Sequence, residues 1–177
     1  MPADFDCRRA AASDALCLSV LATQVFLDTY ATQGINADLS SEVTTVLSRQ
    51  SFQVRLASSA VELFVAEVNG YMVGFIDLDP TTACPIPMHA GLEVARLYVQ
   101  QPFQRGGIGR ALMALAEDRA RAKGLGALWL TAWVGNHRAR SFYEALGYQD
   151  VGATRYFIEG QGYENRVLVK ALPARAA

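Results

Sequence analysis

Hydrophobic positions near the start of this chain recur at helical spacing. From Ser13 to about Ala31, apolar residues return every three or four positions, and Ser13 stands where its hydroxyl can cap the first turn. The same spacing from Leu39 to Arg49, behind Asp38, predicts a second and shorter helix. We therefore expect two amphipathic helices before the first strand.

The period then changes to that of extended chain. Two runs rich in β-branched and aromatic residues, ELFVAEV and YMVGFIDL, flank Asn69-Gly70. Asn-Gly supplies the two positive-φ residues of a tight hairpin turn, so the pattern predicts two antiparallel strands. Three prolines follow between Asp79 and Ala90. Because proline cannot donate to a strand ladder, we expect a surface loop there.

Strands and helices alternate in the second half of the chain. A strand, LEVARLYV, leads into a Gly-rich turn, and a helix is predicted from Gly107 to Lys123. The next strand, ALWLTAWV, is almost continuously apolar, which favours burial of both faces. A helix beginning at Asn136 and two strands between Gly152 and Leu172 complete the pattern. The order α-α-β-β-β-α-β-α-β-β predicts an α+β fold, a mixed sheet flanked by helices.

Composition narrows the class of protein further. With 177 residues, 51% of them hydrophobic, we expect one domain over residues 1–177. A net charge of -1, spread along the chain, argues against a nucleic-acid groove or a membrane anchor. Three cysteines without CxxC spacing, and only two histidines, favour a reduced protein without a metal site. The absence of a long apolar run or a signal-peptide pattern leads us to expect a cytoplasmic location.

The stretch GLEVARLYVQQPFQRGGIGR, from Gly91 to Arg110, carries the first chemical signal. Glycines at 106, 107 and 109 allow the backbone to approach a ligand closely. The helix that follows directs its unpaired N–H groups and the positive end of its dipole into the same turn. This arrangement predicts a cradle for an anion, most often phosphate.

Two motifs together identify a family. The run Gln104-Arg105-Gly106-Gly107-Ile108-Gly109 resembles the Q/R-x-x-G-x-G/A signature with which the GNAT superfamily of N-acetyltransferases binds coenzyme A. The later block NHRARSFYEALGY is similar to the family's N-x-x-A-x-x-F-Y-E-x-x-G-F/Y segment, and it follows the expected strand. One departure is Pro102, which stands two residues before Gln104, where many relatives carry a proline three before. We expect a slightly different turn there and an intact cradle.

The resemblance implies transfer of an acetyl group from acetyl-CoA to a primary amine, by direct attack through a tetrahedral intermediate and without a metal. It assigns the pyrophosphate to the backbone N–H groups from Arg105 to Arg110, with the side chains of Gln104 and both arginines as helpers, or the arginines as solvated charges. It assigns the pantetheine arm to a splayed strand edge whose N–H groups polarise the thioester carbonyl. The implied cofactor-binding residues are Leu97, Tyr98, Val99, Gln104, Arg105, Gly106, Gly107, Ile108, Gly109, Arg110 and Asn136.

Two residues are the candidates for proton transfer. Tyr143 matches the family's tyrosine that donates a proton to the departing thiolate; the alternative is a half-buried aromatic on an amphipathic helix. Glu93 is the candidate base for the amine, and the alternative is a surface carboxylate paired with Arg96. Asn136 matches a CoA-side asparagine but is equally a good helix N-cap. His137 is a weaker candidate base.

The acceptor amine is the least determined part of the function. A faint similarity to the bacterial spermidine/spermine acetyltransferase type, in QVFLDTYATQGINADLSSEV, favours a small amine or polyamine. The alternatives are an N-terminal peptide or protein acetyltransferase and a non-catalytic CoA-binding sensor. We expect acetyl-CoA and an amine as partners, no nucleic acid or membrane, and a homodimer as the assembly to consider. Four aromatic residues are candidates for lining the acceptor site or for core packing: Phe26, Tyr30, Phe75 and Tyr156.

Overall fold

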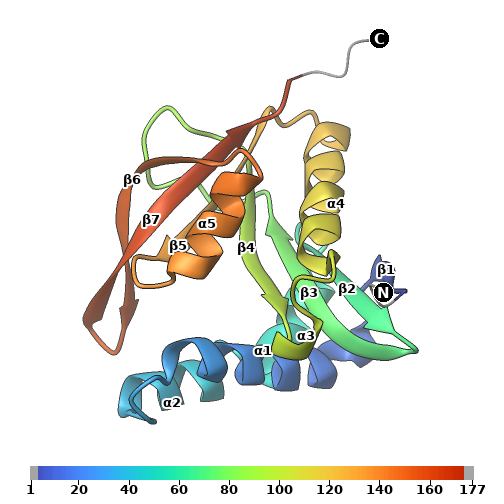
Figure 1. Ribbon diagram of the computed structural model, residues 1–177, viewed down its shortest axis with the longest axis vertical. Helices are drawn as coiled ribbons and strands as arrows, with labels where there is room; N and C mark the ends of the chain where they lie inside the picture. The colour runs from blue at the N-terminus through green and yellow to red at the C-terminus, as the bar shows by residue number, and fades with distance from the viewer. Residues whose placement is uncertain (1–3, 174–177) are drawn as a thin grey trace. The chain divides into compact units, whose positions relative to one another are not determined.

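The computed structural model describes residues 4–173, and their contacts divide the chain into two compact units. The first unit covers residues 4–77 and 96–112, and the second covers residues 78–95 and 113–173. Strands β3 (Tyr71–Asp79) and β4 (Leu92–Val99) and helix α4 (Ile108–Ala122) each run through both units. The predicted α+β class with a mixed sheet is confirmed (Figure 1). The single domain over residues 1–177 stays a prediction.

The first unit combines three helices with one end of the sheet. Its elements are β1 (Asp6–Arg9), α1 (Ala15–Tyr30), α2 (Ala37–Thr44), α3 (Arg49–Ala57), β2 (Glu62–Val68), β3 (Tyr71–Asp79) and the second half of β4. The strands follow the order β1-β2-β3-β4. The hairpin predicted around Asn69-Gly70 is confirmed, since both residues have positive φ, 52° and 80°.

Four features of the N-terminal half differ from the prediction. The helix expected from Leu39 to Arg49 is α2, which already ends at Thr44, and a helix that was not predicted, α3, begins at Arg49, where the hydroxyl of Ser48 accepts a hydrogen bond from the N–H of Ser51. The N-cap of α2 is Asn36 rather than Asp38. A short 3₁₀ turn occupies Ala12–Asp14, so Ser13 does not cap α1. Strand β1 escaped prediction because all four of its residues are exposed and show no apolar alternation.

Aromatic packing between helix and sheet forms the core of this unit. The ring of Phe75, on β3, lies 5.7 Å from that of Phe52 on α3 and 5.5 Å from that of Tyr98 on β4. Phe26 is buried in the same cluster, and the half-buried Tyr30 packs against it. Three of the four aromatic residues considered for the acceptor site therefore pack in this core, and burial of such rings is a main source of its stability.

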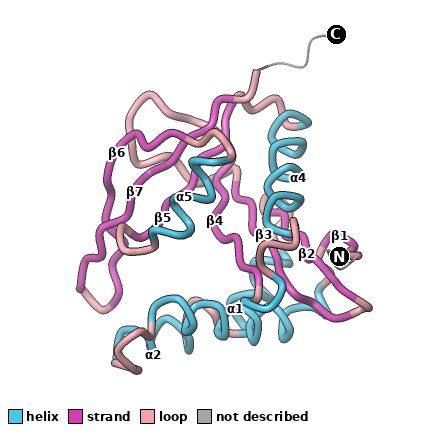
Figure 2. Tube along the Cα trace, in the orientation of Figure 1, coloured by secondary structure: helices cyan, strands magenta, loops and turns pink. Residues whose placement is uncertain are grey.

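The second unit is built around the other end of the sheet. Its elements are the first half of β4, the rest of α4, β5 (Ala127–Trp133), α5 (His137–Ala145), β6 (Gln149–Ile158) and β7 (Gln161–Ala171) (Figure 1). The strands follow the order β4-β5-β7-β6, with β4 and β5 parallel and the other pairs antiparallel. Figure 2 shows the proline-containing connection between β3 and β4 as loop, as predicted.

Strand β5 differs from the prediction in one respect. Leu128, Trp129 and Leu130 are buried, but Thr131 is exposed, so the strand is not covered on both faces along its whole length. Side chains alternate between the two faces of a strand, which places Trp129 and Thr131 on one face and Leu128 and Leu130 on the other. The face at Thr131 is open to a ligand.

Candidate active site

Strands β4 and β5 pair only where they begin. Two Cα pairs join them, Leu92 with Leu128 and Glu93 with Trp129, and among the described residues of this unit the register does not continue to Val94. Both strands nevertheless run on, β4 to Val99 and β5 to Trp133. Within the second unit, Val94 and Ala95 of β4 are thus not part of the ladder with β5. A parting of this kind was expected from the family resemblance, but the sequence offered no direct sign of it.

The Gly-rich turn between β4 and α4 belongs to the first unit. Arg105 and Gly107 both adopt positive φ, 65° and 92°, and the carbonyl of Gly107 accepts the first bond of the helix, from the N–H of Ala111. The N–H groups of the first helical turn therefore have no partner within the helix. A Cβ added at Gly107 would meet no atom within 4 Å, so the space before the turn is open. The turn has the features of an anion cradle.

Side chains around this turn take different roles. The side-chain amide of Gln104 donates to the carbonyl oxygen of Val99 at 2.7 Å, which ties the turn back to the end of β4. Arg105 and Arg110 are exposed at the surface of the turn. Gly74, on β3, has no room for a side chain, since a Cβ would lie 2.9 Å from the carbonyl oxygen of Tyr98. The end of β4 is therefore packed closely against β3.

Helix α5, in the second unit, carries the second motif. Asn136 is its N-cap, and its side-chain oxygen accepts from the N–H of Ala139 at 3.1 Å. Tyr143 is buried, 8% exposed, and its ring lies 5.2 Å from that of Phe142 and 6.0 Å from that of Tyr148. These contacts fix the orientation of the Tyr143 ring. His137, in the first turn, is exposed.

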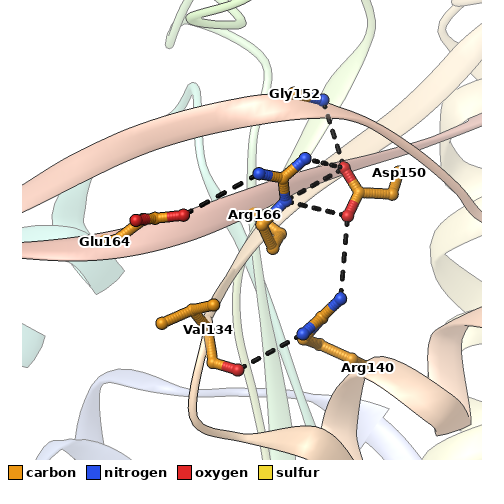
Figure 3. A network of polar contacts seen from close by, with 6 residues as sticks. All are labelled: Val134, Arg140, Asp150, Gly152, Glu164 and Arg166. Atoms are coloured by element: carbon orange, nitrogen blue, oxygen red, sulfur yellow. Dashed lines mark hydrogen bonds and ion pairs between the residues drawn. The ribbon is translucent and has the colours of Figure 1, made fainter.

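A network of ion pairs holds α5 to the sheet of its unit (Figure 3). Arg166, on β7, donates from Nε and Nη2 to the carboxylate of Asp150, at 2.9 and 2.8 Å. Arg140, on α5, lies 3.8 Å from the same carboxylate and donates to the carbonyl of Val134 at 3.3 Å. The guanidinium of Arg166 holds the pKa of Asp150 below its usual value. The network links α5 with β6 and β7.

Tyr148 follows α5 and lies beside Tyr143. Its hydroxyl is buried and has no hydrogen-bond partner among the described residues, while Lys170 Nζ lies 5.7 Å from its ring centroid. Burial, and then the negative charge of Glu117, raise the pKa of Tyr148. The side chain is therefore a neutral phenol at physiological pH.

An open pocket of about 230 Å³ lies in the second unit, on the face of the sheet that carries Thr131. Glu93 and Trp129, the last pair of the β4–β5 ladder, both contribute to its wall. The side-chain amide of Asn165 donates to the hydroxyl of Thr131 at 3.4 Å, so these two polar groups share this face. The lining residues are Thr82, Ala83, Pro85, Glu93, Trp129, Thr131, Thr154, Arg155, Tyr156 and Asn165.

Glu93 is thus part of a pocket wall, and it is half-buried. Arg96, the cation considered as its surface partner, donates from Nη1 to Asp77 at 2.7 Å. Tyr156 also lines the pocket, unlike the other three aromatic candidates. Sequence analysis missed Thr131, Asn165 and Thr154. A threonine inside the apolar run ALWLTAWV was the available signal, since a polar residue there marks an uncovered face.

The described residues contain no group of three or more His, Cys, Asp or Glu side chains placed to hold a metal ion. Cys7, Cys17 and Cys84 are free thiols. Within residues 4–173, no helix is both long and apolar enough to cross a bilayer.

Comparison with known sequences gives a consistent result. The family model of the acetyltransferase (GNAT) family matches residues 31–148. An N-acetyltransferase of Lactobacillus delbrueckii subsp. lactis is 26% identical over 72% of this chain and 74% of its own. The [ribosomal protein bS18]-alanine N-acetyltransferase of Salmonella typhimurium is 36% identical over 42% of this chain and 51% of its own.

Solved structures share the fold. The paiA N-acetyltransferase of Thermoplasma acidophilum, crystallised in complex with coenzyme A, superposes with a TM-score of 0.76 at 20% identity, over 95% of this chain and 99% of that one. The yncA acetyltransferase of Salmonella typhimurium, crystallised with acetyl-CoA, has a TM-score of 0.67 at 18% identity, over 98% and 97% of the two chains.

Proposed function

Because this chain belongs to the acetyltransferase (GNAT) family, we propose that it transfers an acetyl group from acetyl-CoA to a primary amine bound beside Glu93. One observation carries the assignment of the site. The β4–β5 ladder ends at the Glu93–Trp129 pair, and the same two residues line the open pocket. The pocket therefore begins where strand backbone is released, and released N–H groups can stabilise a developing oxyanion.

Residues of the Gly-rich turn fit the phosphate end of acetyl-CoA. The positive φ of Arg105 and Gly107, and the open space before Gly107, support a cradle of backbone N–H groups from Arg105 to Arg110. Arg105 and Arg110 are exposed, and they supply positive charge near bound phosphates. In this proposal Gln104 positions the turn through its bond to Val99.

Glu93 and Tyr143 divide the proton transfers. An alkyl amine has a pKa of about 10 and arrives protonated, so the carboxylate of Glu93 first attracts the ammonium and then accepts its proton, directly or through water. The leaving thiolate takes a proton from the hydroxyl of Tyr143. The ring contacts of Tyr143 support this role, because they hold one orientation. Asn136 caps α5 and so positions Tyr143.

The favoured acceptor is a small amine or polyamine, since the pocket holds a carboxylate and about 230 Å³. The match to ribosomal-protein-alanine N-acetyltransferases supports a second candidate, the amine of a peptide N-terminus.

A homodimer is the assembly that we propose to test by light scattering. We also propose a cytoplasmic location, which the cysteine usage of the sequence favours.

A thiol-release screen tests the proposed function. Acetyl-CoA is incubated with polyamines, aminoglycosides, amino acids and short peptides, and each hit is checked for the N-acetylated product by mass spectrometry. We expect amine-dependent thiol release that Glu93→Gln slows at neutral pH, with the pH–rate profile moving to higher pH as the free amine becomes abundant. Binding of acetyl-CoA without release for any amine would instead favour a CoA-binding sensor.

A further inference from the structure

The pocket beside Glu93 has an uneven distribution of charge. Among its lining residues Glu93 is the one acidic residue and Arg155 the one basic residue. Most of the others are neutral: two of the three threonines stand on strands, and Tyr156, Trp129 and Asn165 contribute a phenol, an indole and an amide. The position of Arg155 therefore decides whether an acceptor with its own carboxylate finds a cationic partner.

Arg155 lines the pocket, but its side chain lies on the opposite face of the sheet from those of Thr154 and Asn165. Asn165 is on the pocket face, because its amide reaches the hydroxyl of Thr131, and Thr154 is its cross-strand partner. Because successive side chains of a strand point to opposite faces, Arg155, which follows Thr154, lies on the other face. Gly162 stands three residues before Asn165 and so lies on that other face as well. The position of the Arg155 side chain is consistent with this placement. Its Cδ and Nη1 atoms lie 3.4 and 3.5 Å from the point where a Cβ atom on Gly162 would stand.

We infer that this site selects amines whose neighbouring group is neutral and polar, and rejects free α-amino acids. The inference rests on the proposed function, since it concerns the acceptor of that site. A carboxylate two bonds from the amine would stand within about 5 Å of the carboxylate of Glu93, and at that separation like charges repel strongly in a partly buried site. An amide or hydroxyl in the same place meets hydrogen-bonding partners of matching kind, Thr131, Thr154 and Asn165.

The neutral wall also bears on polyamines. A second ammonium group placed deep in the pocket would meet hydroxyl and amide oxygens, which can accept its hydrogen bonds, while Glu93 is engaged by the first, so a polyamine is also compatible with this wall. Amino amides, amino sugars and peptide N-termini offer an amine to Glu93 and a neutral polar group to the hydroxyl and amide side chains of the wall. Selectivity of this type is a matter of repulsion as much as of attraction.

Alaninamide and alanine provide the matched acceptor pair for the test. Each is titrated calorimetrically into the CoA-saturated protein, and acetyl transfer to each is followed by thiol release. We expect alaninamide to bind at least about ten-fold more tightly than alanine. Equal binding, tighter binding of alanine, or binding of neither would overturn the inference. A failure of the proposed function looks different: alaninamide binds, yet no thiol is released.

Lysine substitutions supply the second arm. Thr131→Lys, or Thr154→Lys should the first variant fold poorly, places a cation on the pocket face. Either change should lower the amide-to-acid binding ratio by about ten-fold, because the acid gains a partner. The two amines differ in basicity, so the change in ratio between proteins is the decisive quantity. Ser59→Lys, at an exposed position outside the pocket, adds the same charge and should leave the ratio unchanged. An unchanged ratio in both pocket variants would also overturn the inference.

Discussion

At the scale of single residues, Tyr143 and Tyr148 make a matched pair. Both are buried, and their rings lie 6.0 Å apart. Only Tyr143 stands at the motif position whose tyrosine we propose to protonate the thiolate. We expect Tyr143→Phe to slow thiol release by about 10²-fold while acetyl-CoA affinity stays within a factor of a few, because one general acid is lost. Stopped-flow detection of the thiol, with a separate binding titration, measures the two effects.

Tyr148→Phe is the control for that change. Its hydroxyl is buried without a hydrogen-bond partner among the described residues, so removing it should leave turnover unchanged and stability equal or higher, by up to about 1–3 kcal/mol. If both phenylalanine variants lost activity equally, loss of aromatic packing around α5 would explain the result and Tyr143 would not be the acid.

Most of the site residues that we could propose from the sequence belong to one of the two motifs. The glycines of the cradle and Tyr143 stand at fixed spacings that a reader of the sequence can find. Thr131 and Asn165 could not be found in this way, because they meet only when β5 and β7 pair, and that register is set by the whole sheet. The pocket wall is a product of tertiary pairing rather than of local sequence.

At the scale of elements, a buried carboxylate joins three segments of the first unit. Asp77, on β3, is 0% exposed, and it accepts from Arg55 on α3 and Arg96 on β4, each at 2.7 Å. The guanidinium of Arg96 also lies 5.8 Å from the ring centroid of Phe52. The carboxylate thus holds a helix and two strands together beside the edge that leads to the Gly-rich turn.

Asp77→Asn should destabilise the protein strongly. It leaves two largely covered guanidinium groups without a countercharge, and breaking a buried ion pair from one side costs about 3–5 kcal/mol. Urea unfolding followed by circular dichroism measures the loss. Asp28→Asn, an exposed carboxylate on α1, is the control and should change the unfolding free energy by less than about 0.5 kcal/mol. A loss of similar size in both variants would mean that the ion pairs of Asp77 add no more to the free energy of unfolding than an exposed carboxylate does.

The Asp150 network gives a prediction about pH. Arg166 lowers the folded-state pKa of Asp150, so its stabilising effect is present above the unfolded pKa and is lost as pH falls through the folded value. Asp150→Asn should therefore lower the melting temperature at pH 7, and the difference from wild type should narrow as pH falls below about 4. Asp118→Asn, at a side chain 60% exposed, should show a smaller difference at every pH. A difference for Asp150→Asn that keeps the same size from pH 7 down to the lowest pH at which the protein stays folded would contradict the ion-pair explanation.

Element types were more predictable than their boundaries. The Asn69-Gly70 hairpin and helix α4 follow from turn chemistry and apolar period, and both are present. The end of α2 at Thr44 and the whole of α3 were missed, because the cap at Ser48 starts a new helix close to where the apolar pattern of the first was read to end. Local hydrogen bonding outweighed periodicity at that position.

At the scale of the whole chain, the family and the fold agree. The GNAT family model covers residues 31–148, and the structural neighbours share the fold over nearly the full chain. A fold shared this widely does not fix a substrate, so the acceptor must be argued from the pocket. The α+β order was predictable because alternating periods survive in the sequence. The parting of β4 and β5 was not, since it depends on where a parallel ladder stops.

The central claim is that acetyl-CoA binds at the Gly-rich turn, and thermal unfolding with Gly107→Glu tests it most directly. Acetyl-CoA at about 100 times its dissociation constant should add roughly 2.7 kcal/mol, or about 5–10 °C for a chain of this size. Gly124→Glu is the matched control, since that glycine also has positive φ and open space around it. We predict that wild type and Gly124→Glu keep the shift and that Gly107→Glu loses it. The same shift in Gly107→Glu, or none in wild type, would contradict the account.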